Sequence, residues 1–151
     1  GALAYYVDGE APGARIRTPE INAHASPVAT VKAVRDRITA LLRGMTRYGD
    51  LVVEGRDITT VVFPDSPARF YLTASPEARA RRRQLEEVAT GVANQSAEAV
   101  KASLLARDAI DSTRAYAPLR KADGVLEIDS TQLTLDQVVE TVLDALPAGW
   151  R

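Results

Sequence analysis

The chain has 151 residues, of which 46% are hydrophobic, and a formal net charge of −1 from 19 basic and 20 acidic residues. This length and composition predict one globular domain, and the balanced charge gives no general attraction to nucleic acid or to an anionic membrane. The chain has no cysteine and a single histidine, His24, which excludes disulfides and disfavours a zinc site. With no apolar run long enough for a bilayer and no signal-peptide pattern, the sequence predicts a cytoplasmic protein.

The first third of the chain predicts two strands, a helix and a third strand. Short β-type runs are expected at 3–7 and 14–18, with a turn at 8–13 between them. Ser26 and Pro27 have the pattern of a helix N-cap followed by proline in the first turn. The apolar stripe that follows predicts a helix as far as about Arg43, and another β-type run comes at 51–54.

The rest of the chain continues the alternation of strands with helices. A strand is expected at 68–72, a helix after the Ser75-Pro76 cap, a loop at 88–96 and a helix at 97–106. A strand at 125–128 precedes a capping box at 134–137, which begins a last helix whose apolar side chains are expected to be buried. This order predicts an α/β fold with a parallel sheet.

The segment Gly55-Arg56-Asp57 comes directly after the β-type run 51–54. In α/β proteins, ligands bind beyond the carboxyl ends of the strands. The planar fork of arginine suits a phosphate, and aspartate accepts hydrogen bonds from amino or hydroxyl groups. The pair therefore predicts a small ligand that carries a phosphate and a polar base, and the alternative is a surface ion pair or a turn cap.

Two further groups of charged residues are candidates for a site. Arg107, Asp111 and Arg114 share one helix face, where the arginines could hold phosphate; the alternative is an exposed ion pair worth ~0.3–0.5 kcal/mol. A basic cluster at 79–83 could bind nucleic acid or be a solvated helix face. The neutral net charge and the acidic residues at 86 and 87 argue against nucleic acid.

Several motifs in one order give the chain a resemblance to a known family. They are Ile16-Arg17-Thr18-Pro19-Glu20, Ala25-Ser26, Gly55-Arg56-Asp57, Tyr71–Arg83, Arg107-Asp108, Asp111, Arg114-Ala115, Ala117-Pro118-Leu119 and Ile128–Thr131. The sequence is similar over nearly its whole length to the bacterial cytidylate kinases. The resemblance implies a three-layer P-loop nucleoside monophosphate kinase-like α/β fold with a parallel sheet. It also implies a single domain over 1–151, with 1–25 in the CMP-binding subdomain and 79–114 in the lid.

The resemblance departs from the family at its N-terminal end. The family begins with a strand and a loop that ends in lysine, and no G-x-x-x-x-G-K-[ST] is present here. That strand is central in the family, between the counterparts of 51–54 and 68–72. The chain is therefore expected to be an excised or truncated segment that lacks its central strand. Either a partner segment supplies that strand, or the two neighbours pair directly, or the segment is marginally stable. The complete protein is expected to be a monomer.

The family's functional residues can be carried over position by position. By resemblance, Arg56 and Arg114 hold the phosphate of CMP, and Arg107 acts with them in catalysis. Residues Ser26, Arg35 and Asp57 read the cytosine, Arg107 and Asp111 contact the sugar, and Arg82 and Arg83 act on the donor side in the lid. An ideal helix places positions nine apart about 180° from each other, so Ser26 and Arg35 share one base only if Ser26 precedes the helix.

The implied activity is transfer of the γ-phosphoryl group of ATP, with Mg²⁺, to CMP or dCMP. The chain itself offers no metal site, and because the phosphate loop is missing, the segment alone is expected to be inactive. The alternative is a non-catalytic nucleotide-binding or interaction module that has lost this loop. No nucleic-acid or membrane partner is expected.

Overall fold

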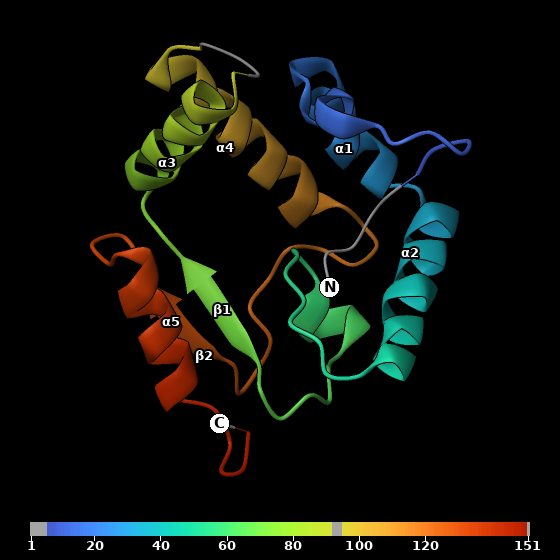
Figure 1. Ribbon diagram of the computed structural model, residues 1–151, viewed down its shortest axis with the longest axis vertical. Coiled ribbons are helices and arrows are strands. Elements are labelled where there is room, and N and C mark those ends of the chain that lie inside the picture. The colour runs from blue at the N-terminus through green and yellow to red at the C-terminus, as the bar shows by residue number, and fades with distance from the viewer. Residues whose placement is uncertain (1–5, 92–94, 151) are drawn as a thin grey trace.

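The computed structural model describes residues 6–91 and 95–150. Figure 1 shows a small sheet beside α5, with α3 and α4 above it and α1 and α2 at the opposite side. The elements in chain order are η1 (Gly13–Arg17), α1 (Pro19–Ala29), α2 (Lys32–Gly44), η2 (Met45–Tyr48), η3 (Ile58–Val62), β1 (Phe70–Thr73), α3 (Pro76–Thr90), α4 (Ala97–Thr113), β2 (Leu126–Asp129) and α5 (Leu135–Asp144).

The sheet has two parallel strands. β1 pairs with β2 in a register that sets Phe70 opposite Leu126. Beyond the strand ends, the backbone N–H and the hydroxyl of Ser130 both donate to the carbonyl oxygen of Thr73, at 2.8 and 2.9 Å. The strands predicted at 68–72 and 125–128 are confirmed within two residues.

The strand predicted at 51–54 is wrong, because none of these residues belongs to a strand. Val52 in this segment is fully exposed, at 105% of its reference area. A strand is stabilised by the hydrogen-bond ladder to a neighbour. Within the described ranges the sheet consists of β1 and β2 alone, so the apolar run 51–54 has no ladder to join.

The strands predicted at 3–7 and 14–18 are not found among the residues that the structure describes. Residues 13–17 form the 3-10 helix η1 instead of the strand predicted at 14–18. Most of the run 3–7 lies outside the described residues, and Val7 makes an isolated antiparallel bridge to Glu10. The intervening Asp8 and Gly9 both have positive φ, as a tight Asp-Gly turn requires, so the predicted turn begins where expected.

The helix predicted from Ser26 to Arg43 is two helices. α1 begins earlier, where the hydroxyl of Thr18 accepts a hydrogen bond from the N–H of Ile21, and Pro27 lies inside it. α1 ends at its C-cap Thr30, the backbone is extended at Val31, and α2 then runs to Gly44. Ser26 is therefore a buried residue within α1 and not an N-cap, so the single-helix geometry expected for Ser26 and Arg35 does not apply.

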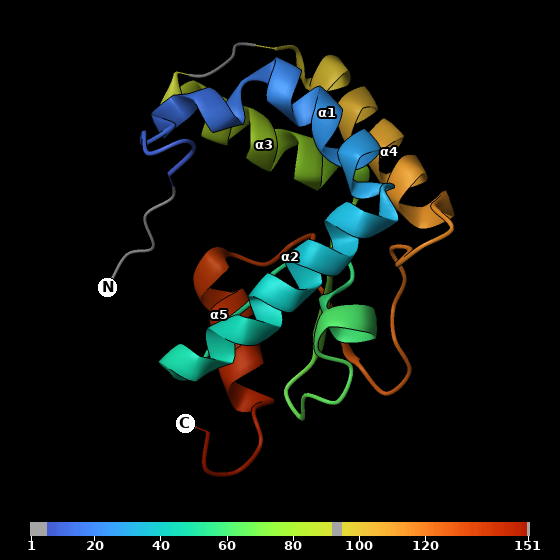
Figure 2. The same ribbon diagram turned by 90° about the vertical axis from the view of Figure 1, so that its right-hand side faces the viewer.

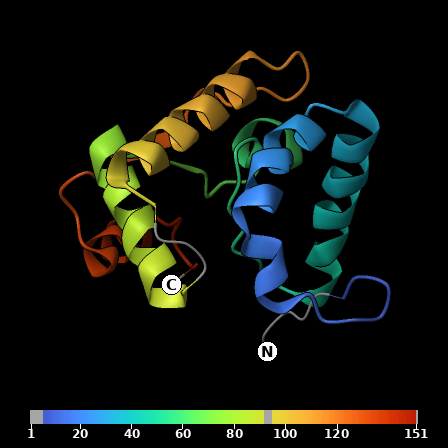
Figure 3. The same cartoon turned by 90° about the horizontal axis from the view of Figure 1, so that it is seen from above.

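Helices α3 and α4 pack on each other, and α1 packs on α4 (Figures 2 and 3). Ser75 caps α3 as predicted, since its hydroxyl accepts from the N–H of Ala78 at 3.2 Å, and Gly91 ends the helix in the left-handed conformation. The loop predicted from 88 starts later, because α3 continues to Thr90. α4 is longer than the 97–106 prediction and brings its charged end beside the 55–57 loop.

The capping box of α5 is confirmed by reciprocal hydrogen bonds between Thr134 and Gln137, at 2.9 and 3.3 Å. The buried apolar face expected for α5 is not found, and Leu135 is 78% exposed. A two-stranded sheet offers little surface for a helix to cover. The buried apolar side chains among the described residues are accordingly small: Val62, Ala80, Val100, Ala117, Val125 and Ile128.

Candidate functional site

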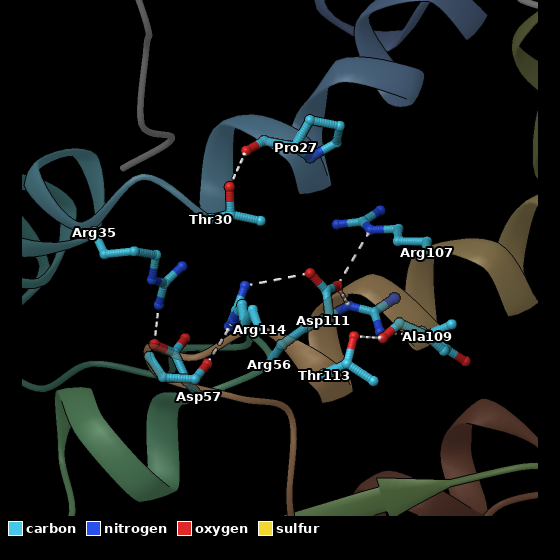
Figure 4. Close-up of polar contacts among 12 residues, drawn as sticks. Pro27, Thr30, Arg35, Arg56, Asp57, Arg107, Ala109, Asp111, Thr113 and Arg114 are labelled. Carbon is cyan, nitrogen blue, oxygen red and sulfur yellow. Dashed lines mark hydrogen bonds and ion pairs between the residues drawn. The ribbon is translucent and has the colours of Figure 1, made fainter.

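Charged side chains from α2, the 55–57 loop and the end of α4 meet in one cluster (Figure 4). Asp111 lies at its centre and is 2% exposed. Its carboxylate is 2.9 Å from Nε of Arg56, 3.2 Å from Nη1 of Arg114 and 3.8 Å from Nε of Arg107. Three arginines that are distant in sequence or on different helix turns thus share one buried carboxylate.

Local backbone geometry fixes this arrangement. The carbonyl of Asp111 accepts from the N–H of Leu119 at 2.7 Å, and Nε of Arg114 donates to the carbonyl of Ala117 at 2.6 Å. Ala117 has a φ of 51°, a left-handed conformation that is rare for residues other than glycine. The turn after α4 is therefore folded back so that Arg114, at the helix C-cap, reaches the cluster.

Asp57 and Arg35 form a second buried pair beside the first group. Asp57 is buried, and its carboxylate accepts from Nη2 of Arg35 on α2. The carbonyl of Asp57 also accepts from Val61 at 2.9 Å, within the turn that becomes η3. Burial lowers the pKa of Arg35, and the nearby positive charge of Arg114 adds to this shift.

Asp108, one turn before Asp111 on α4, also binds Arg56 and adds one further guanidinium group, that of Arg79. Its carboxylate accepts from Nη1 of Arg56 and from both terminal nitrogens of Arg79 on α3. Burial alone raises the pKa of Asp108, but the hydrogen bonds from Arg79 and Arg56 outweigh it and hold the pKa below its ordinary value. Asp108 is therefore an ionised link between α3, α4 and the 55–57 loop.

The charge balance of this cluster favours an anion. The guanidinium groups of Arg56, Arg79, Arg107 and Arg114 face the carboxylates of Asp108 and Asp111, and the Arg35–Asp57 pair is neutral as a whole. Four positive charges against two negative ones leave an excess of two. A phosphate monoester carries about −1.5 to −2 at pH 7, which matches this excess.

Three buried polar atoms at or near the cluster lack a hydrogen-bond partner in the described structure. They are Nη2 of Arg114, Nε of Arg35 and Oγ of Ser26. A buried donor without a partner costs ~1–3 kcal/mol, so such atoms are tolerated where a ligand completes them. Two of the three are guanidinium donors, which again suit an anionic or oxygen-bearing ligand.

The structure brings most of the predicted site residues together and leaves three apart: Ser26, Arg82 and Arg83. Arg56, Arg107, Asp111 and Arg114 share contacts, as do Arg35 and Asp57, whereas Ser26 has no hydrogen bond to them. Arg82 instead donates to the hydroxyl and carbonyl of Ser130 and to the carbonyl of Leu133. Arg83 pairs with Glu86 and Glu87 on its own helix. Neither Arg82 nor Arg83 therefore binds a residue of the cluster.

The sequence places Arg79 in the basic cluster 79–83 and Asp108 in a family motif, but it does not predict that either belongs to the site. Helical spacing places Arg107, Asp111 and Arg114 on one face of the helix. The same spacing could have predicted Asp108 there, because it lies three residues before Asp111. A second contact was not predicted: the hydroxyl of Tyr116 donates to Asp36 at 2.9 Å, and Lys32 pairs with the same carboxylate at 2.7 Å. This second contact ties α2 to the turn after α4.

Over residues 6–91 and 95–150, no three histidine, aspartate or glutamate side chains are grouped so that they could hold a metal ion. In the same part of the chain, no helix combines the length and the apolarity that crossing a membrane requires.

The fold and the cluster define an α/β protein with an arginine-rich site suited to a phosphate-bearing ligand. The sequence model of the family described as cytidylate kinase matches residues 2–148. The chain is 48% identical to the cytidylate kinase of Streptomyces griseus subsp. griseus over 139 residues, covering 91% of this chain and 58% of that protein. It is 45% identical to that of Mycolicibacterium paratuberculosis over 93% of this chain and 61% of the relative, and 40% identical to that of Limosilactobacillus fermentum over 91% and 61%.

The chain belongs to the cytidylate kinase family. Its parallel strands with helices around them are part of the α/β fold of the P-loop nucleoside monophosphate kinases, as the resemblance implied. The chain spans about three fifths of the length of the relatives it matches, with shares of 58% and 61% in the first two.

Proposed function

We propose that the protein containing this chain transfers the γ-phosphoryl group of ATP to CMP or dCMP, and that these 151 residues supply the acceptor side of the site. The observation that carries the proposal is the positive excess of two in the cluster around Asp111. The relatives' name, cytidylate kinase, supports a nucleoside monophosphate as the ligand. The proposed location is the cytoplasm, where both nucleotides are available.

The acceptor would lie with its phosphate toward Arg56 and Arg114 and its base toward Arg35 and Asp57. Asp57 is a carboxylate, and a carboxylate accepts hydrogen bonds only, which fits the exocyclic amino group of cytosine. Arg35 has a buried Nε without a partner that can donate to an oxygen or ring nitrogen of the base. Arg107 and Asp111 are proposed to contact the sugar hydroxyls, and Ser26 is proposed to complete the base site.

The chemistry asks little of these residues beyond position and charge. The attacking atom is an oxygen of the acceptor phosphate, which is largely ionised at pH 7, so no general base is needed. Phosphoryl transfer is accelerated by in-line positioning and by positive charge around the moving group. We propose that Arg56, Arg114 and Arg107 provide these, with Arg82 and Arg83 acting from α3 on the donor.

On the donor side, we propose ATP with Mg²⁺, contacted by Arg82 and Arg83 of α3. Mg²⁺ bound to ATP would neutralise charge on the donor phosphates, and it is usually held by substrate phosphates and one or two protein oxygens. Arg82 is bound to the carbonyls after β2, and Arg83 to glutamates, so both must exchange partners to reach a nucleotide. We therefore propose that this segment alone has no kinase activity. We also propose that the complete protein is a monomer.

The alternative is a non-catalytic module that binds a nucleotide or another protein. The specific observation in its favour is that the cluster around Asp111 forms without Arg82 or Arg83, the two residues proposed to act on the donor. Binding measurements alone do not separate the two functions, whereas turnover does.

The first prediction concerns binding by the 151-residue chain. In a calorimetric titration, CMP is expected to bind with a one-to-one stoichiometry, and GMP is expected to bind much more weakly because its base has a carbonyl where Asp57 needs an amino group. Cytidine serves as the control for the phosphate contribution. Equal affinity for CMP and GMP would contradict the proposed base site.

The second prediction concerns turnover. With ATP and CMP at high concentration, the 151 residues are expected to produce no ADP above a no-enzyme blank, because they contain no G-x-x-x-x-G-K-[ST] phosphate loop and because Arg82 and Arg83 are bound to other groups. The protein at its full natural length is expected to produce ADP and CDP in equal amounts. ADP formation by the 151 residues would overturn the first part, and no turnover at full length would favour the non-catalytic alternative.

A further inference from the structure

Asp108 holds two arginines that belong to different parts of the molecule. Its Oδ1 accepts from Nη1 of Arg56 and, at 3.2 Å, from Nη2 of Arg79, while its Oδ2 accepts from Nη1 of Arg79. Arg79 lies on α3, and Arg56 lies in the loop before η3. A single carboxylate on α4 therefore joins α3 to the arginine that is proposed to hold the acceptor phosphate.

Asp108 is placed to exchange partners, and Asp111 is not. The side chain of Asp111 is almost fully buried, whereas that of Asp108 is 21% exposed and that of Arg79 is 31% exposed. An aspartate in contact with water can lose one ion-pair partner without becoming a buried, unpaired charge, which is the costly case. Asp108 can thus shift between Arg56 and Arg79 while Asp111 keeps Arg56 in place through its Nε at 2.9 Å.

A carboxylate and a phosphate use the same donor atoms of an arginine. Since Nη1 of Arg56 already donates to Asp108, an incoming phosphate must share or displace that carboxylate. Arg79 engages both oxygens of Asp108 and so weakens its hold on Arg56. If Arg79 is removed, Asp108 binds Arg56 only. The Asp108 carboxylate then competes more strongly with the phosphate for the donor atoms of Arg56.

We propose that Asp108 is a positioning residue through which Arg79 on helix α3 sets the strength of phosphate binding at Arg56. With Arg79 on Asp108, Arg56 is available to the phosphate of the acceptor nucleotide. With Arg79 displaced, Asp108 occupies Arg56 and phosphate affinity falls. The inference rests on the proposed acceptor role of Arg56 and adds to it a link between the helix α3 and the acceptor site.

The test measures the ratio of the dissociation constants of cytidine and CMP in the protein at its full natural length, by calorimetry. This ratio isolates the phosphate contribution and cancels effects on the base site. Arg79→Gln is expected to lower the ratio about fivefold, in the range of coupling between residues of one ionic network. Asp108→Asn is expected not to lower it, and the double variant is expected to match Asp108→Asn.

The control is Lys101→Gln, which breaks another α3–α4 ion pair, an exposed one to Glu77, and is expected to leave the ratio unchanged. The urea midpoint of each variant shows whether it is folded. The inference is overturned if Arg79→Gln leaves the ratio unchanged, or if it lowers the ratio equally with and without Asp108. If the unsubstituted protein binds cytidine and CMP equally, the phosphate role of Arg56 itself fails, which is a separate result.

Discussion

Replacing Asp111 with asparagine is expected to lower the free energy of unfolding by about 3–5 kcal/mol, the usual cost of removing one partner of a buried ion pair. The physical reason is that Arg114, with a side chain 3% exposed, and Nε of Arg56 lose their shared countercharge and cannot turn to water. Urea unfolding followed by circular dichroism measures the change. A domain has only about 5–15 kcal/mol of stability, so this loss is a large fraction of the total.

The matched control is Glu127→Gln, which removes a carboxylate from an ion pair with Lys121 at 2.8 Å in which both side chains are about half exposed. Exposed pairs contribute ~0–1 kcal/mol, so this variant should unfold near the unsubstituted midpoint. A change of less than 1 kcal/mol for Asp111→Asn would show that the cluster does not depend on this carboxylate. Failure of Asp111→Asn to fold, with a folded control, agrees with the expected loss.

Asp57→Asn is expected to change base selectivity more than any other single substitution. If Asp57 accepts a hydrogen bond from the cytosine amino group, its loss should weaken CMP binding about tenfold to a hundredfold, since hydrogen bonds to charged groups contribute ~1.5–3 kcal/mol. UMP has a carbonyl at that position, to which the new amide can donate. The ratio of CMP to UMP affinity, measured by calorimetry, should therefore fall sharply.

This ratio separates selectivity from stability, because Asp57→Asn also breaks the buried pair with Arg35. Damage to the fold lowers the affinity for CMP and for UMP by the same factor, so the ratio of the two affinities stays unchanged. Asp65→Asn, an exposed aspartate eight residues further along, is the control and should alter neither affinity. An unchanged ratio in folded Asp57→Asn would remove Asp57 from the base site.

The sequence predicts those elements whose signals are local. The Ser75 cap and the capping box at Thr134 and Gln137 are confirmed because caps depend on neighbouring residues. The strands predicted at 68–72 and 125–128 are confirmed because they pair with each other. The strand predicted at 51–54 depends on a distant partner and does not form. The α2 start is also missed, because Pro27 imitates a first helical turn although it lies inside α1.

The site residues also divide into those that local spacing predicts and those that depend on tertiary packing. Helical spacing predicts that Arg107, Asp111 and Arg114 share a face, and the resemblance to the family adds Arg56, Arg35 and Asp57. The approach of Arg79 to Asp108 comes from the packing of α3 on α4, which no spacing within either helix encodes. Likewise, Asp36 and Tyr116 are 80 positions apart, and their hydrogen bond follows only from how the chain folds back after α4.

The pairing of β1 with β2 has a consequence for the order in which the chain folds. Phe70 faces Leu126, 56 positions later, so the sheet can form only after a long loop has closed. The contact between Arg79 and Asp108 bypasses the segment between them and shortens the remaining path to about half. Halving the length of a loop lowers the entropic free-energy cost of closing it by about 0.6 kcal/mol. Docking of α3 on α4 before the strands pair is therefore the entropically favoured order.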